Sequence, residues 1–250
     1  DLATIYEREH RFHPDYICYV VDNRQNLHFE QVFRVAKKAG LTGANLEFLG
    51  YGTVNGEDGK PYKTRSGNTP KLDGLFEQTK EIFLSKKEEN KDKSEEDIQK
   101  IVNAILKFAD LQNSRERDYI FDIHKFSNTV GKTGPYILYT YLRIDKILKQ
   151  CATPTNLSVQ IYNKVDRDLR LKLLELDKVI LMAFEDRKPN YIADYIYQLS
   201  DLANSFYQNN HLANLEDENK KNDWLYVLTL TNKVLKELLF LIGIEIPTFM

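Results

Sequence analysis

The 250-residue sequence predicts an α/β segment followed by an all-helical segment. In the first eighty residues, the apolar run Tyr16 to Val21 precedes apolar residues at helical spacing and a second strand-like run, Leu46 to Tyr51. Strand, helix and strand with short links describe a βαβ unit with parallel strands. Beyond about residue 130 the apolar residues recur only at helical spacing, which is typical of a helix bundle.

The first strand-like run is apolar throughout, so we expect a parallel strand that is buried on both faces and ends at Asp22. The helix after it is indicated by five apolar residues, and Gly40 is expected to end it as its C′ residue. Those five residues are Phe29, Val32, Phe33, Ala36 and Ala39.

The remaining elements follow from caps and periodicity. The charged run 86–96 contains no apolar residue and predicts an exposed loop. Near its end, Ser94 and Asp97, three residues later, resemble a capping box at a helix start. Four further helices are predicted, the last of them closed by Gly243 and Pro247. They are Tyr136 to Leu148, Leu169 to Phe184, Tyr191 to Phe206 and Trp224 to Ile242.

Composition excludes some classes of protein. With 42% hydrophobic and 29% charged residues the chain has ordinary soluble composition, and no run approaches the about 20 apolar residues of a membrane span. The charged first ten residues do not resemble a signal peptide, so we expect a cytoplasmic protein with no membrane partner. No Cys or His cluster has metal-ligand spacing, so no protein-bound metal is expected.

The net charge of −2 argues against a uniformly basic nucleic-acid binder. Between Arg143 and Lys172, however, seven basic residues face three acidic ones. Such a local excess of positive charge is suited to phosphate contacts, although a solvated helix face explains it equally well.

Two polar segments lie where ligands bind in parallel sheets. The segment Asp22 to Phe29 follows the first strand and holds a carboxylate, three amides, a guanidinium and an imidazole; the alternative is a helix N-cap with surface polar groups. The loop Gly56 to Gly67 joins glycines to Lys60, Lys63 and Arg65, as phosphate-binding loops do, but plain surface loops share this composition.

Six blocks in chain order resemble the arginyl-tRNA synthetases, and they are spread along most of the chain, from Tyr19 to Pro247. Three of the blocks read YVVDNRQNLHFEQVF, GYGTVNGEDGKPYKTRSG and TGPYILYTYLRI. The six blocks are Tyr19–Phe33, Gly50–Gly67, Phe108–Asp122, Thr133–Ile144, Glu185–Tyr191 and Gly243–Pro247.

The resemblance implies a partial Rossmann-type class I catalytic domain, residues 1–127 with its connecting helices, followed by a helical DALR-type anticodon-binding domain, residues 128–250. It implies an arginine–tRNA ligase, in which arginine and ATP give arginyl-adenylate and the arginyl group passes to tRNA(Arg). ATP with Mg²⁺ would be the substrate, and we expect a monomer.

The resemblance also implies roles for single residues. Asp1 and Gln25 would bind the substrate arginine, whose five guanidinium donors need acceptors. Asp22 and His28 would lie near the adenylate. Within the loop that resembles the KMSKS motif, Lys63 and Arg65 would be catalytic and would bind ATP together with Thr64 and Ser66.

One departure from the family pattern concerns the HIGH motif of class I synthetases, which is absent from this sequence; His10 to His13 is no substitute. We therefore expect a C-terminal fragment that lacks half of the nucleotide pocket and cannot activate arginine alone. Arginine-dependent formation of ATP from pyrophosphate by this polypeptide would contradict that expectation.

In the helical segment, Tyr136, Tyr139 and Arg143 share one helical face. Aromatic rings beside a guanidinium suit the reading of unstacked RNA bases, whereas tyrosines at helical spacing are also ordinary core residues. The resemblance implies that these three residues, with Tyr207 and the terminal Met250, contact the anticodon. Two other functions remain open: a non-catalytic tRNA-binding or protein-binding module derived from a synthetase, and a different nucleotidyl-transfer enzyme.

Overall fold

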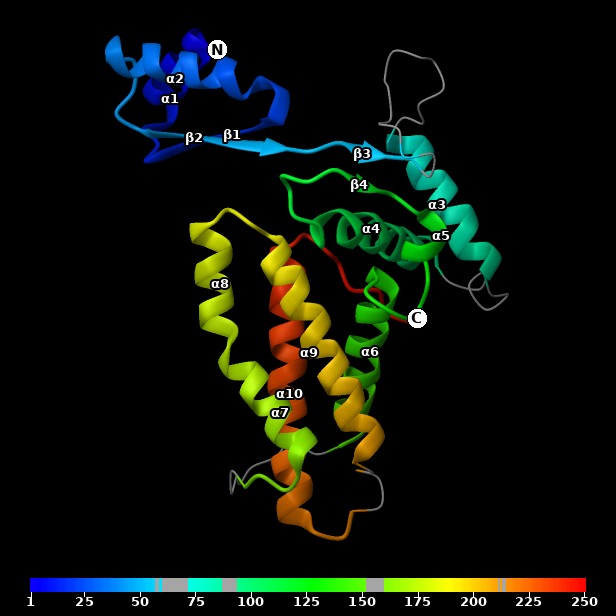
Figure 1. Ribbon diagram of the computed structural model, residues 1–250. Coiled ribbons are helices and arrows are strands. Elements are labelled where there is room, and N and C mark those ends of the chain that lie inside the picture. Colours follow the sequence, from blue (N-terminus) through cyan, green and yellow to red (C-terminus); the bar gives the residue numbers. More distant parts are fainter. Residues whose placement is uncertain (57–58, 60–71, 87–93, 152–159, 211, 213–214) are drawn as a thin grey trace. The chain divides into compact units, whose positions relative to one another are not determined.

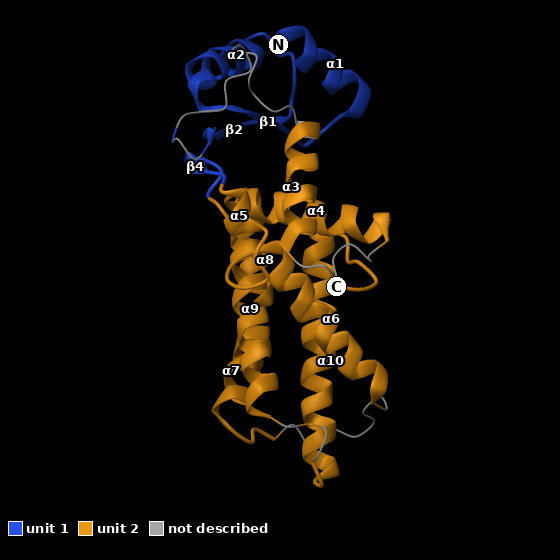
Figure 2. Cartoon of the chain, turned by 90° about the vertical axis from the view of Figure 1, so that its right-hand side faces the viewer, with its two compact units in different colours: residues 1–63, 114–121 blue, residues 64–113, 122–250 orange. Residues whose placement is uncertain are grey.

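The computed structural model describes residues 1–250 except 57–58, 60–71, 87–93, 152–159, 211 and 213–214 (Figure 1). The chain divides into two compact units, which are coloured separately in Figure 2. Unit 1 comprises residues 1–63 and 114–121, and unit 2 comprises residues 64–113 and 122–250. No helix of the described part is long and apolar enough to cross a membrane.

Unit 1 contains the predicted βαβ arrangement. Its elements are α1 (Leu2–Phe12), β1 (Tyr16–Asp22), the 3₁₀ helix η1 (Asn23–Gln25), α2 (Asn26–Lys38) and β2 (Asn45–Tyr51). Strands β1 and β2 pair in parallel, from Tyr16 opposite Asn45 to Asp22 opposite Tyr51. Gly40 has a positive φ of 62°, and Leu41 N donates to Ala36 O, which confirms the predicted helix end.

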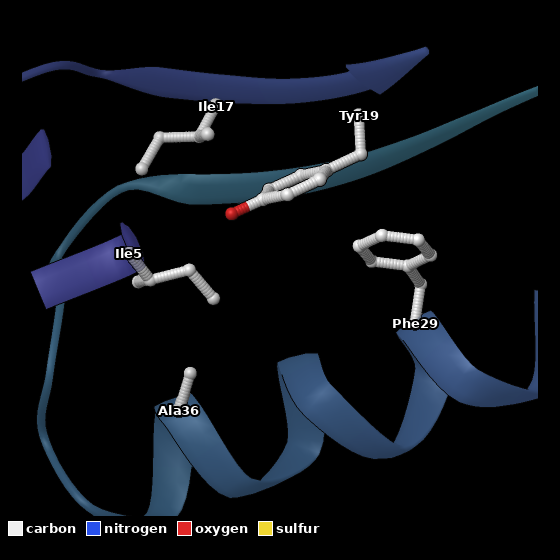
Figure 3. Close-up of a cluster of buried hydrophobic side chains, with 5 residues drawn as sticks. All are labelled: Ile5, Ile17, Tyr19, Phe29 and Ala36. Carbon is white, nitrogen blue, oxygen red and sulfur yellow. The ribbon is translucent and has the colours of Figure 1, made fainter. Parts of the chain in front are cut away.

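The predicted burial of β1 on both faces is wrong. Ile17 and Tyr19 are 7% and 8% exposed and point toward Ile5 of α1 and Phe29 of α2 (Figure 3). Tyr16 and Val20, on the opposite face, are 52% and 60% exposed. Successive side chains alternate across a strand, and α1 and α2 both pack on the same face, so an all-apolar run is only half buried here.

A segment distant in sequence completes unit 1. The short strand β3 (Val54–Asn55) pairs in parallel with β4 (Tyr119–Ile120). Just before this pair, Gly52 N donates to Arg115 O over 2.9 Å. A Cβ on Gly52 would lie 2.5 Å from the backbone carbonyl carbon of Arg117, so only glycine permits this approach.

Unit 2 is helical. Helices α6, α9 and α10 pack against one another, while α4 packs on α6 and α3 packs on α4. Its elements are α3 (Leu72–Lys86), α4 (Glu95–Leu111), α5 (Ile123–Phe126), α6 (Gly134–Gln150), α7 (Lys164–Leu174), α8 (Leu176–Glu185), α9 (Asn190–Asn209) and α10 (Glu218–Leu241). The bundle core is formed by side chains that are almost fully buried, among them Ile101, Ile137, Leu199 and Leu228.

Two predicted helix ends are confirmed. The Ser94 hydroxyl accepts a hydrogen bond from Asp97 N over 3.1 Å at the start of α4. After α10, Gly243 has a φ of 69° and Ile244 N donates to Leu239 O over 2.8 Å, which is the Schellman pattern. The predicted exposed loop 86–96 lies mostly outside the described residues.

The single helix predicted over Leu169–Phe184 is wrong, because α7 and α8 are separated by a turn at Glu175. The carbonyl oxygen of Lys172 accepts from Glu175 N (3.1 Å) and from the hydroxyl of the buried Tyr195 (2.8 Å). A tyrosine on α9 therefore holds the carbonyl at the point where the helix breaks, a contact that helical periodicity cannot reveal.

Candidate functional site

At the carboxyl end of β1, Asp22 is bound by Arg24. The Asp22 carboxylate accepts from Arg24 N and Nε (both 2.8 Å) and from Nη2 (2.5 Å). The side-chain hydrogen bond from Arg24 is the largest of the effects that lower the pKa of Asp22 to about 2. This carboxylate is therefore ionised at neutral pH and has a partner within its own turn.

Asp1 and His28 lie together at the start of two helices. Asp1 precedes α1 and His28 lies in the first turn of α2, with 2.6 Å between Asp1 Oδ2 and His28 Nε2. An ionised carboxylate can only accept, so Nε2 carries the hydrogen in this contact. Gln25, exposed at the N-cap of α2, is joined to neither by any hydrogen bond of the described residues.

The KMSKS-like residues Lys63, Thr64, Arg65 and Ser66 lie outside the described residues. Their predicted roles with ATP therefore stay predictions. Among the described residues, no group of three or more His, Cys, Asp or Glu side chains is placed to hold a metal ion.

A third polar segment, residues 114–118, lines the same edge of the sheet and was given no role by sequence reasoning. Asn23 Nδ2 donates to Glu116 O (3.1 Å) and Arg115 Nη1 donates to Gly50 O (2.5 Å). The Asp118 carboxylate accepts from Thr53 N (2.6 Å), and this bond lowers the pKa of Asp118. The only sequence signal was its place within the third resembling block.

In unit 2, three of the predicted anticodon residues form one cluster. The Cζ atom of Arg143 lies 4.5 Å from the ring centroid of Tyr139 on the same helix, α6, and 5.4 Å from that of Tyr207 on α9. Tyr139 and Tyr207 are each 40% exposed. A guanidinium thus lies against two rings that still present surface to solvent, an arrangement on which planar groups can stack. We call these residues the Tyr–Arg cluster.

The other two predicted residues are placed differently. Tyr136 is half-buried: its hydroxyl donates to Asp201 (3.2 Å), its ring lies 5.9 Å from that of Tyr197, and burial raises its pKa. Met250 is half-buried at the end of a segment held by α4. There the Asp97 carboxylate accepts from Thr248 N (2.7 Å) and Thr248 Oγ1 (2.6 Å).

Sequence reasoning also missed the polar residues beneath the cluster. Asn204 and Thr140 are 8% and 0% exposed, and Arg143 Nη1 donates to Asn204 Oδ1 over 2.9 Å. Their signal was weak: Asn204 lies on the apolar side of α9, eight residues after the buried Ile196.

Comparison with known proteins assigns both parts of the chain. Residues 1–123 match the family model "tRNA synthetases class I (R), catalytic domain", and residues 137–250 match the "DALR anticodon binding domain". The arginine–tRNA ligase of Alkaliphilus oremlandii is 45% identical over 99% of this chain, and that of Francisella tularensis subsp. novicida is 38% identical over 99%. The chain belongs to the arginyl-tRNA synthetase family.

The chain spans 44% of the length of each of these two synthetases. Two solved arginyl-tRNA synthetases share the fold. The Plasmodium falciparum enzyme matches 98% of this chain and 43% of its own with a TM-score of 0.77 and 25% identity. The Thermus thermophilus enzyme matches 94% and 41% with a TM-score of 0.80 and 22% identity, which shows the fold alone. The expected pairing of a class I catalytic domain with a DALR domain is thereby confirmed.

Proposed function

We propose that this chain is part of an arginine–tRNA ligase and that its helical unit binds the anticodon loop of tRNA(Arg). The observation that carries the proposal is the Tyr–Arg cluster, which lies within the residues that match the anticodon-binding family model. Anticodon bases are unpaired and can be splayed out onto aromatic rings or guanidinium planes. Each stacked base contributes roughly 1–3 kcal/mol of binding free energy.

The βαβ unit supplies the proposed catalytic part. Asp1 and Gln25 would accept hydrogen bonds from the guanidinium of the substrate arginine, and His28, 2.6 Å from Asp1, would hold that carboxylate in place. Asp22 would act near the adenylate through the turn that it fixes with Arg24. ATP with Mg²⁺ is the co-substrate, and Lys63, Thr64, Arg65 and Ser66 would contact its phosphates. The division at residues 127/128, the monomeric state and the cytoplasmic location belong to the same proposal.

Binding of tRNA by this chain tests the proposal. We expect an arginine-accepting tRNA transcript to bind more tightly than the same transcript with its three anticodon bases replaced. Tyr139→Ala removes one exposed ring and should weaken binding of the unaltered transcript by roughly 5- to 100-fold, since one stacking platform is lost. The altered transcript should respond much less to this substitution.

Phe184→Ala is the matched control, because Phe184 is an aromatic side chain of the same unit that is 67% exposed and lies outside the cluster. It should leave the Kd unchanged. If Tyr139→Ala binds both transcripts like the unaltered protein while its helical circular dichroism is intact, the proposed anticodon site is wrong.

A further inference from the structure

We infer that Asn204 is a positioning residue for anticodon binding, holding the Arg143 guanidinium between Tyr139 and Tyr207, and that Thr140 fixes the orientation of Asn204. The inference rests on the proposed function, because it assigns Arg143 to RNA. In this inference, Asn204 and Thr140 do not touch a base themselves and act through Arg143, which does.

The geometry is a chain of hydrogen bonds beneath the Tyr–Arg cluster. Arg143 Nη1 donates to Asn204 Oδ1 (2.9 Å), and Asn204 Nδ2 donates to Thr140 Oγ1 (2.7 Å). Thr140 Oγ1 donates in turn to the backbone oxygen of Tyr136 (2.9 Å), one turn earlier on α6. Asn204 is 8% exposed and Thr140 is fully buried, so water competes little for these bonds.

Donor and acceptor counts allow this chain to run in one direction only. The hydroxyl of Thr140 has a single hydrogen, which the Tyr136 carbonyl takes, so its oxygen must accept from Asn204. The amide NH₂ therefore faces Thr140, and the amide oxygen faces Arg143. Flipping the amide would set its NH₂ against a guanidinium, which has only donors.

The amide holds Arg143 without neutralising it. Among the described residues, Arg143 takes part in no ion pair. The carboxylate of Asp145, two residues further along α6, pairs with Lys149 instead. A carboxylate at position 204 would hold the guanidinium equally well but would cancel its charge. A neutral acceptor fixes the plane of the guanidinium against the rings and leaves its positive charge available to RNA.

A double-mutant cycle tests the inference, with Kd for the arginine-accepting tRNA transcript as the measurement. We expect Arg143→Ala to weaken binding by about 10-fold or more and Asn204→Leu by roughly 5- to 10-fold, the effect of losing one typical hydrogen bond. Because Asn204 acts through Arg143, adding Asn204→Leu to Arg143→Ala should change the Kd by less than about 2-fold.

The Thr140 position gives a matched pair that does not depend on how well Asn204→Leu folds. Thr140→Ser keeps the hydroxyl and should bind like the unaltered protein, whereas Thr140→Val removes it at nearly the same volume and should weaken binding by about 3-fold. In the Arg143→Ala background the two variants should be indistinguishable.

Three outcomes distinguish a failure of the proposed function from a failure of the inference about Asn204 and Thr140. If Arg143→Ala binds normally, the proposed function fails, and the inference fails with it. If Arg143→Ala weakens binding but Asn204→Leu and Thr140→Val do not, only the inference fails. If the effects multiply in the double variants, Asn204 acts independently of Arg143, through the packing of α6 on α9 or through its hydrogen bond to the Tyr136 side chain, and the positioning role is refuted.

Discussion

Gly134 lies where the backbone of α6 closely approaches that of α4, and its replacement by alanine should destabilise unit 2. An added Cβ would lie 2.4 Å from the backbone oxygen of Ala104 and 2.9 Å from the nitrogen of Ile105. Both are backbone atoms of α4, so no side chain can rotate away. Reaching the ordinary contact distance of 3.4 Å requires the two helices to separate by about 1 Å.

Two opposing effects set the expected change in the free energy of unfolding. Overpacking of this kind costs about 3 kcal/mol, because buried side chains of both helices lose van der Waals contact when the backbones move apart. Alanine is favoured over glycine in a helix by up to about 1 kcal/mol. We therefore expect Gly134→Ala to lower the free energy of unfolding by about 2 kcal/mol, although helix propensity alone predicts the opposite sign.

Urea denaturation followed by circular dichroism at 222 nm measures this effect. A loss of about 2 kcal/mol should lower the midpoint by roughly 1 M. The control is Gly43→Ala, where an added Cβ meets nothing within 4 Å; its midpoint should stay close to that of the unaltered protein. A midpoint for Gly134→Ala that equals or exceeds the unaltered value would refute the close-approach argument.

Two further predictions concern carboxylates. Asp97→Ala removes both hydrogen bonds to Thr248, so the last residues of the chain should open more often. Carboxypeptidase should then release Met250 at least several-fold faster than from the unaltered chain. An unchanged rate would show that Asp97 does not hold these last residues in place. For Asp22, the pKa of about 2 lies below the ordinary 3.8, so its contribution to stability is present above about pH 4 and is lost as the pH falls through 2. A carboxyl NMR titration should place its midpoint near 2 and, in Arg24→Ala, nearer 3.8; a midpoint near 4 in the unaltered protein would contradict the Arg24 contact.

The elements that sequence predicted well are those fixed by local chemistry. Gly40 and Gly243 end helices because each takes a positive φ, and Ser94 begins one because its hydroxyl accepts from Asp97 N. The interruption at Glu175 depends instead on Tyr195, twenty residues later, whose hydroxyl reaches the carbonyl of Lys172. A hydrogen bond of this kind between two helices leaves no trace in the apolar periodicity of either one.

The same distinction applies to burial in β1. An apolar run reports that side chains can be buried, but the number of covered faces depends on which helices pack there. Both α1 and α2 place their apolar residues against Ile17 and Tyr19, so Tyr16 and Val20 face away from that core. The return of residues 114–121 to unit 1 was equally beyond local reasoning, because its partners, Gly50 and Gly52, lie more than sixty residues earlier.

The Tyr–Arg cluster depends both on local helix geometry and on the packing of two helices that are distant in sequence. Tyr139 and Arg143 are four residues apart on α6, so helical geometry alone puts them side by side. Tyr207 and Asn204 reach the same guanidinium from α9, which requires the packing of the two helices. Because one helix supplies the cation and the other supplies its acceptor and second ring, any change in how α6 packs on α9 alters the surface that we propose to bind a base. The stability of the bundle and the proposed affinity for RNA are therefore coupled through Asn204, and the double-mutant cycle distinguishes the two effects.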